Sequence, residues 1–373
     1  MNQGKHLSNR LPSLATWQLE RRVGLKNLEK ILPDLMSVNA RKTKPLISSF
    51  DKKLDTMPSL QALIQHDEVE SALVLKGNNI TFEYYAKNFS ISSLHSAQSS
   101  SKPISLLLLE KAILARKISI NDKVEDYIPE IGKGFFGHSI KEIMSMKVPH
   151  EFDEMTAYTA PEGSRLHQLR IEDEISFGYL PLKGAEPIAR REFAKKLKSR
   201  SPEVNKKVND SSIIYATINT EVAGWVLERA MQTPLALQVR ELMHEIGGEN
   251  TVYMSLDHHG VPSIGAGLIL TTRDFARYGM LLQDCTYLST VRNEVGIEDS
   301  YSNDKYCLSL TVNDLGYAHS GWGGQHVFVS PETDIVIVLF GGINGEDPMP
   351  QSYFKLINSA TNELTSYYVG SPS

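Results

Sequence analysis

Two strand-pair patterns, one near each end of the chain, constrain the fold most strongly. SALVLK and ITFEYYA flank Gly77, Asn78 and Asn79, and β-branched and aromatic residues around residues that tolerate positive φ predict a β-hairpin. Near the other end, HVFVS and DIVIVLF flank Pro331 and Glu332, where proline suits the second position of a turn. The segment SYFKLINSATNEL that follows is predicted to be a helix.

The chain between these hairpins has helical patterns. PISLLLLEKAILARK, IKEIMSMK, PIARREFAKKLK, EVAGWVLERAM and ALQVRELMHEI all favour helix by composition and spacing. We therefore predict an α+β fold, in which an antiparallel sheet from both chain ends is flanked by helices and an all-helical region is inserted. The predicted division is an α/β domain of residues 1–115 and 250–373, a mainly helical domain of residues 116–249, and an active site between them.

Composition limits the function classes. The 373 residues are 41% hydrophobic, and the net charge of −5 comes from 39 basic and 44 acidic residues without a long block of one sign. This balance is ordinary for a soluble enzyme and argues against a nucleic-acid partner. No stretch predicts a membrane span or an export signal, so we expect a cytoplasmic protein, or a periplasmic one if a signal has been removed. Cys285 and Cys307 read as packing residues, although a bond between them stays open, and the oligomeric state is not predicted.

Residues 96–103, SAQSSSKP, hold a serine three positions before a lysine. On a helix, Ser99 and Lys102 would share one face with about 5–6 Å between their Cβ atoms, so the amine could reach the hydroxyl. The first turn of a helix also offers unpaired N–H groups to a reacting carbonyl oxygen. Burial by the following PISLLLL would weaken the lysine's preference for its charged form and let it accept the serine proton.

This spacing alone is weak evidence. It occurs three more times, at Ser49 with Lys52, Ser302 with Lys305 and Ser352 with Lys355. In the alternative interpretation, the three serines at positions 99–101 only cap a core helix, and Lys102 lies in solvent.

The order of motifs separates the first pair from the others. A hairpin, then the SxxKP pattern, a buried helix and the phrase KISINDKVEDYIPEI resemble the serine β-lactamase and penicillin-binding protein family. The resemblance implies the β-lactamase-like fold, with Ser99 as nucleophile and Lys102 as its base. It also predicts a tyrosine that opens a helix, and a Lys or His with Thr or Ser and Gly on the last strands.

Tyr215 is the tyrosine candidate. In SSIIYATINTEVAGWVLERA it stands where an extended stretch gives way to a periodic helix, for which Asn219 is the expected N-cap. By resemblance, this tyrosine passes protons between the serine, the lysine and the leaving group.

The third motif is GYAHSGWGGQHVFV, in which His319, Ser320 and Gly321 take the family's triad position. GAGLILTTRDFARYG upstream also matches a family phrase. By resemblance, the backbone N–H groups of Ser99 and Trp322 form the oxyanion hole. A glycine-rich strand bend would explain the glycines but not their order relative to the other motifs.

The wording is closest to one branch of the family. HSAQSSSK, FDEMTAYTAP and YATINTEVAGWVLERA look like the carboxylesterases and aminohexanoate-oligomer (nylon-oligomer) hydrolases of the class C β-lactamase-like group, over roughly residues 68–345. Thr217 replaces the asparagine of class C β-lactamases, and His319 replaces a lysine. Both changes point to uncharged ester or amide substrates. Glu154 and Tyr158 are candidates for substrate contact in a loop.

We therefore predict a serine hydrolase that cleaves a small-molecule ester or amide through an acyl-enzyme on Ser99, with no cofactor or metal. Competing motifs fail, because HEIGG lacks the second histidine of a zinc-protease helix and no G-x-S-x-G sequence occurs. Two alternatives remain, a D,D-peptidase or weak β-lactamase, and a non-catalytic ligand-binding member of the fold.

Overall fold

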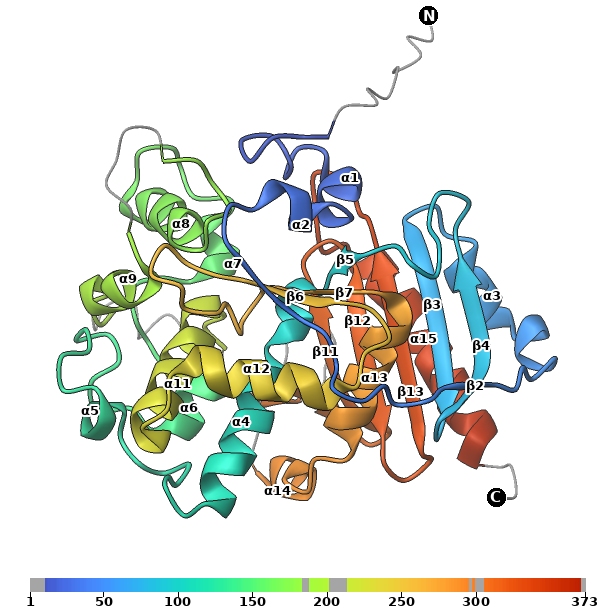
Figure 1. The fold of residues 1–373 in the computed structure, drawn as a ribbon. Helices are drawn as coiled ribbons and strands as arrows, with labels where there is room; N and C mark the ends of the chain where they lie inside the picture. Colours follow the sequence, from blue (N-terminus) through green and yellow to red (C-terminus); the bar gives the residue numbers. More distant parts are fainter. Residues whose placement is uncertain (1–10, 183–187, 201–212, 295–296, 299–304, 370–373) are drawn as a thin grey trace, which may run out of the picture.

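A nine-stranded sheet built from both ends of the chain dominates the structure (Figure 1). The computed structural model describes residues 11–182, 188–200, 213–294, 297–298 and 305–369. The strand order is β2-β4-β3-β13-β12-β11-β10-β9-β8, and a smaller sheet has the order β1-β6-β7-β5. The strands are β1 (Leu35–Val38), β2 (Ile47–Ser48), β3 (Val69–Lys76), β4 (Asn79–Tyr85), β5 (His95–Ser96), β6 (Val252–Ser255), β7 (Leu268–Leu270), β8 (Ile297–Glu298), β9 (Lys305–Cys307), β10 (Leu310–Asn313), β11 (Gly316–Gly321), β12 (Gln325–Ser330) and β13 (Ile335–Gly341).

Helices cover the large sheet and form the region inserted between its two halves. They are α1 (Arg21–Leu25), α2 (Leu28–Ile31), α3 (Pro58–Ile64), α4 (Pro103–Leu114), α5 (Val124–Tyr127), α6 (Ile140–Met144), α7 (Glu154–Ala157), α8 (Arg165–Ser176), α9 (Arg190–Lys196), α11 (Thr217–Met231), α12 (Leu235–Ile246), α13 (Thr272–Gln283), α14 (Leu288–Asn293) and α15 (Gln351–Val369). Short 3₁₀ turns are η1 (Leu54–Thr56) and η2 (Gln98–Ser101). No helix among the described residues is long and apolar enough to cross a membrane.

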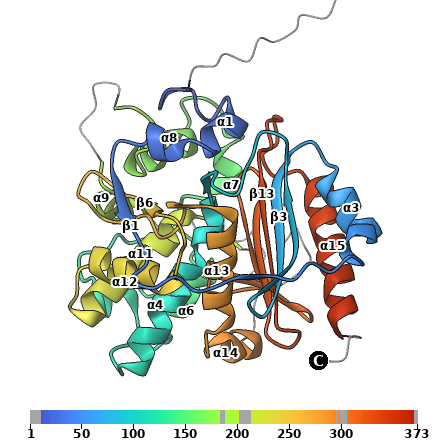
Figure 2. The same cartoon turned by 45° about the vertical axis from the view of Figure 1, so that its right-hand side comes forward.

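Both predicted hairpins are present. Strand β3 pairs antiparallel with β4, and β12 with β13, while β3 also pairs with β13 and so joins the two chain ends. Nearly every residue of β3 and β13 is buried, because α13 covers one face of the sheet and α3 and α15 cover the other (Figure 2). A strand covered on both faces reads as a continuous apolar run. The predicted α+β fold is therefore confirmed.

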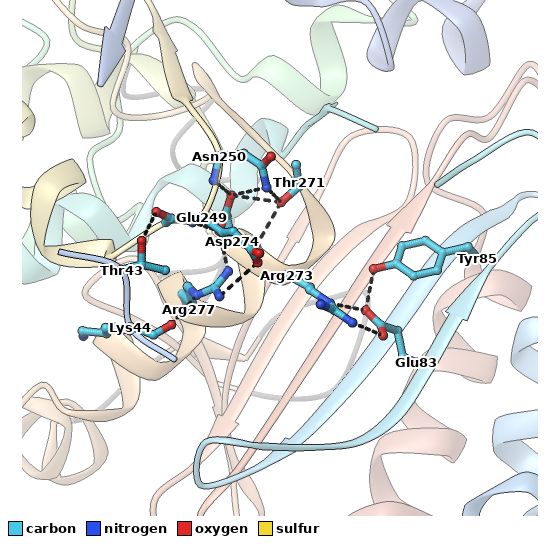
Figure 3. Close-up of polar contacts among 11 residues, drawn as sticks. Thr43, Lys44, Glu83, Tyr85, Glu249, Asn250, Thr271, Arg273, Asp274 and Arg277 are labelled. Carbon is cyan, nitrogen blue, oxygen red and sulfur yellow. Dashed lines mark hydrogen bonds and ion pairs between the residues drawn. The ribbon is translucent and has the colours of Figure 1, made fainter. Parts of the chain in front are cut away.

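The phrase GAGLILTTRDFARYG has a structural role. It forms β7 and the start of α13, where Thr271 caps the helix by accepting a bond from the N–H of Asp274. The buried Asp274 carboxylate also accepts bonds from the N–H groups of Glu249 and Asn250 at 2.8 and 3.0 Å, and from Arg277 at 2.7 Å (Figure 3). One carboxylate thus joins the end of the helical region to the helix that covers the sheet.

The residue before Asp274 in this helix reaches the sheet itself. Arg273 binds Glu83 on β4 with two hydrogen bonds of 2.7 and 2.8 Å, and the hydroxyl of Tyr85 donates to the same carboxylate at 2.6 Å (Figure 3). A bidentate pair of this kind fixes orientation as well as distance. Together the two carboxylates fix α13 against both parts of the fold.

Asp274→Ala is expected to lower the free energy of unfolding by about 3–5 kcal/mol. It leaves two backbone N–H groups without their acceptor and removes the buried carboxylate from the Arg277 guanidinium, which keeps the Lys44 carbonyl oxygen and Glu249 as partners. Urea unfolding followed by circular dichroism measures this change. Glu241→Ala removes an exposed pair with Arg41 and should leave the free energy of unfolding close to that of the wild type, because solvent screens exposed ion pairs. Equal effects of the two variants would contradict the expectation.

Both cysteines lie in the interior. Cys285 and Cys307 are buried free thiols, and burial raises the pKa of the Cys285 thiol to about 12. They act as packing residues, and the bond left open from the sequence is not formed.

Candidate active site

The residue before Ser99 has a strained backbone conformation. Gln98, in η2 between β5 and α4, has a φ of 46°, in the left-handed region that residues other than glycine rarely adopt. Its side-chain amide donates to the Ser96 hydroxyl at 2.8 Å. Outliers of this kind persist only where surrounding contacts enforce them, and they concentrate at functional sites. Ser99 follows directly and keeps 9% of its surface exposed.

Lys102 is fully buried beside that serine. Its Nζ donates to the Ser99 Oγ at 2.9 Å, the Thr217 Oγ1 at 2.9 Å and the carbonyl oxygen of Gly265 at 3.0 Å. The alternative interpretation, in which Lys102 lies in solvent, is therefore wrong. Three acceptors around one ammonium fix the amine against the serine hydroxyl.

Burial lowers the pKa of Lys102 from 10.5 to about 8, and the nearby carboxylates of Glu154 and Glu221 oppose this shift. Desolvation disfavours the charged form, while negative neighbours favour it. A lysine with a pKa near 8 holds a sizeable neutral fraction at mildly alkaline pH. It is therefore able to take a proton from Ser99.

Tyr215 lies directly before α11, and the Nζ of Lys102 is 4.9 Å from the centroid of its ring. The expected Asn219 cap is wrong, because the helix begins at Thr217 and Asn219 lies inside it, where its Oδ1 is 2.8 Å from the Nε2 of buried His150. The Glu154 carboxylate instead accepts the N–H of Thr217 at 2.7 Å. A carboxylate from a different segment thus serves as the cap.

The end of β11 runs past its neighbour and lies beside the serine. Strand β10 pairs only with residues 316–318 of β11, whereas β12 pairs with residues 317–321. The hydroxyl of Ser100 donates to the carbonyl oxygen of His319 at 2.9 Å. A Cβ at Gly321 would lie 2.5 Å from the carbonyl oxygen of Ala97, so this close approach requires glycine.

His319 carries no charge at neutral pH. Its ring is buried, its Nδ1 donates to the carbonyl oxygen of Ser320 at 2.8 Å, and its Nε2 is 3.3 Å from the Tyr306 hydroxyl. Burial, and then the charge of Lys102, lower its pKa to about 3. The histidine therefore supplies no cation for a substrate carboxylate. Ser320 forms a 2.9 Å hydrogen bond between its Oγ and the Nδ1 of His326.

A cavity of about 270 Å³ opens at Ser99. Its lining includes all the predicted side chains that face substrate, namely Ser99, Glu154, Tyr158, Tyr215, His319, Ser320 and Trp322. Lys102 and Gly321 lie behind this lining, where they contact Ser99 and the segment before it. The structure thus brings together residues from three distant parts of the chain.

A second cavity, of about 50 Å³, shares Ser99, Glu154, Tyr158 and Trp322 with the first and is acidic. Asp173 and Glu174 of α8 line it, and the Oδ1 of buried Asp173 has no hydrogen-bond partner in the part of the chain that the structure describes. Burial, and then the nearby Glu154 and Glu174, raise the pKa of Asp173 well above its usual range.

Several residues of this site belong to no recognised motif. Thr217 departs from the family pattern, yet it accepts a hydrogen bond from Lys102. Asp173 and Glu174 stand in a helix without a motif, and Trp17, which lines the second cavity, belongs to a segment without a prediction. For Asp173 the available sequence signal is its position four residues after the apolar Leu169, which puts both on one face of a helix, and in α8 that face is buried.

Comparison with known proteins agrees with this geometry. The β-lactamase family model matches residues 71–361. The chain belongs to the β-lactamase family. It is therefore a serine hydrolase by family, with the β-lactamase fold.

Individual relatives share less than a quarter of their residues with this chain. The 6-aminohexanoate-dimer hydrolase of Paenarthrobacter ureafaciens is 23% identical over 360 residues, which cover 88% of this chain and 87% of that protein. A Bacillus anthracis structure provisionally described as a 6-aminohexanoate-dimer hydrolase superposes with a TM-score of 0.80 at 18% identity, covering 98% of this chain and 99% of that one. A D-stereospecific amidohydrolase from Streptomyces gives 0.56 at 15% identity, covering 81% and 96%.

Proposed function

We propose that this β-lactamase-family member hydrolyses a small amide or ester through an acyl-enzyme on Ser99. The observation that carries the proposal is the 2.9 Å contact between the Ser99 Oγ and the buried Nζ of Lys102, at the mouth of a cavity lined by Tyr215. A nucleophile and its base within hydrogen-bond reach are the minimum requirement for this chemistry.

The first half-reaction forms the acyl-enzyme. Neutral Lys102 takes the Ser99 proton as the Oγ bonds to the substrate carbonyl carbon, and the backbone N–H groups of Ser99 and Trp322 stabilise the resulting oxyanion. The bond to the leaving nitrogen or oxygen then breaks, while Tyr215 relays the proton from Lys102 to that atom. In the second half-reaction, water gives a proton to the same groups as its oxygen bonds to the acyl carbon. The bond between that carbon and the Ser99 Oγ then breaks, the Oγ takes the proton back, and the carboxylic acid leaves.

In place of the uncharged substrate expected from Thr217 and His319, we infer that the preferred substrate carries an ammonium group near the scissile amide. Asp173 and Glu174 line the second cavity beside Ser99, and a substrate cation there would supply the counter-charge that unpartnered Asp173 lacks. The relative from Paenarthrobacter is named for a substrate with a free amino group and an amide bond. An anionic substrate group would gain no counter-charge from Asp173 or from Glu174, which is paired with Arg170, so a β-lactam with its carboxylate is disfavoured, as is the D,D-peptidase alternative.

Exposure to a fluorophosphonate probe tests the proposal. Intact mass is expected to show one label per chain, and p-nitrophenyl acetate is expected to be turned over, whereas Ser99→Ala should lose both. Ser101→Ala is the matched control, because Ser101 lies in the same 3₁₀ turn but its hydroxyl accepts the N–H of Leu268. A folded wild type without label or turnover would favour the non-catalytic, ligand-binding alternative.

A further inference from the structure

The N-terminal segment, defined here as residues 13–32, packs against the turn that holds Trp322. It precedes residues 71–361, which match the family model, and it contains α1 and α2. Trp17, Leu25 and Leu28 form a hydrophobic cluster with Phe177 of the helical region, and Trp322 packs against that cluster. The segment therefore bridges the β11–β12 turn and the helical side of the site.

Two side chains of the N-terminal segment hold the indole of Trp322. Trp17, 1% exposed, meets it edge to face with 5.9 Å between ring centroids, and donates its own indole N–H to the carbonyl oxygen of Tyr179 at 3.1 Å. The Arg21 guanidinium lies 4.8 Å from the centroid of the Trp322 ring. Arg21 also donates to the carbonyl oxygens of Ile343, at 2.8 Å, and Gly345, so it joins the indole to the chain that follows β13.

The turn itself has little intrinsic stiffness. Gly323 and Gly324 have φ values of 97° and 101°, and glycine is the residue with the widest backbone freedom. Leu25 packs against the turn so closely that a Cβ at Gly323 would lie 2.8 Å from its Cδ1. Inside the turn, the N–H of Gly324 donates to the carbonyl oxygen of Gly321 at 3.1 Å, and from outside it the carbonyl oxygen of Pro348 accepts the N–H of Gly323 at 3.2 Å. The backbone position of Trp322 therefore depends on outside contacts as well as on the turn's own hydrogen bond.

We propose that Arg21 and Trp17 are positioning residues for the reaction: the N-terminal segment fixes the Trp322 N–H where the oxyanion forms. The inference rests on the proposed function, because it requires that N–H to be an oxyanion donor. Donors of this type act only when they are held in place before the transition state forms. A displacement of about 1 Å can cost a factor of about 100 in rate.

Arg21→Met tests the proposal in the full chain. It keeps an unbranched side chain against the indole but removes the guanidinium and both carbonyl contacts. We expect kcat for p-nitrophenyl acetate and the rate of fluorophosphonate labelling to fall at least about tenfold, with KM changed by less than about threefold. Arg22→Met is the matched control, because Arg22 pairs with buried Glu70 instead. It should lower the melting temperature but leave kcat within about twofold of wild type.

The outcomes separate the two proposals. Wild type that labels at Ser99 together with a folded Arg21→Met whose kcat is within twofold would overturn this inference and leave the proposed function intact. Wild type without labelling would overturn the proposed function first. If Arg21→Met does not fold, Trp17→Phe keeps a ring beside Trp322 but loses the bond to Tyr179. A kcat equal to wild type in that variant would also overturn the inference.

Discussion

Lys102→Met is expected to lower kcat for p-nitrophenyl acetate by a factor of about 10³–10⁴, because Ser99 loses the base within 2.9 Å of its hydroxyl. The same variant is expected to unfold at the same or a higher temperature than the wild type. Burial of the charged amine costs the folded state free energy, and an apolar side chain of similar length removes that cost. Steady-state kinetics and differential scanning calorimetry measure the two effects.

The direction in which stability changes with pH tests whether the Lys102 pKa is lowered in the folded protein. The Lys102 pKa is about 8 in the folded protein against 10.5 ordinarily, so the unfolded chain binds more protons between these pH values. Wild-type stability relative to Lys102→Met should therefore rise with pH across this window, by at most about 3 kcal/mol. Lys111→Met, on the helix that follows Lys102, breaks an exposed pair with Glu245 and should leave both kcat and the pH profile unchanged. A flat difference between wild type and Lys102→Met would contradict the lowered pKa.

Asp173→Asn is expected to remove a preference for substrates that carry an ammonium group. Two p-nitroanilides, of 6-aminohexanoic acid and of hexanoic acid, differ only in that terminal charge. The wild type should favour the first in kcat/KM, and the variant should lose about ten- to a hundredfold of this preference, the range for a hydrogen bond between charged groups. Activity on the hexanoic acid compound should stay within about twofold of wild type.

A nearby carboxylate provides the control. Asp153 lines the larger cavity and caps α7, and Asp153→Asn keeps a capping side chain while it removes the charge. It should leave the ratio between the two anilides unchanged. If both variants lower the ratio equally, the cavity has a diffuse negative potential and no ammonium site at Asp173. If the wild type shows no preference, the inference about the ammonium is wrong.

The sequence by itself determined the two hairpins at the centre of the large sheet and six of the helices, α4, α6, α9, α11, α12 and α15. Residues 69–85 and 325–341 have apolar runs on both sides of turn residues, and a hairpin needs only such local information. The order of the SxxK segment, Tyr215 and the HSG segment predicted the family for the same reason, since each motif is a short stretch read directly. The predicted N-cap at Asn219 is wrong because residue preferences describe only the local chain. They cannot reveal that the Glu154 carboxylate accepts the N–H at the start of the helix.

Only the tertiary structure decided the environment of Lys102 and the charge of the site. The burial that lowers the Lys102 pKa comes from packing among α4, α11 and the chain around Gly265. The second cavity depends on α8 lying beside the N-terminal segment, where Asp173 and Trp17 both line it and the side-chain amide of Gln18 donates to Glu174. Desolvation and long-range Coulomb interactions act through space between residues far apart in sequence, so no spacing along the chain encodes them.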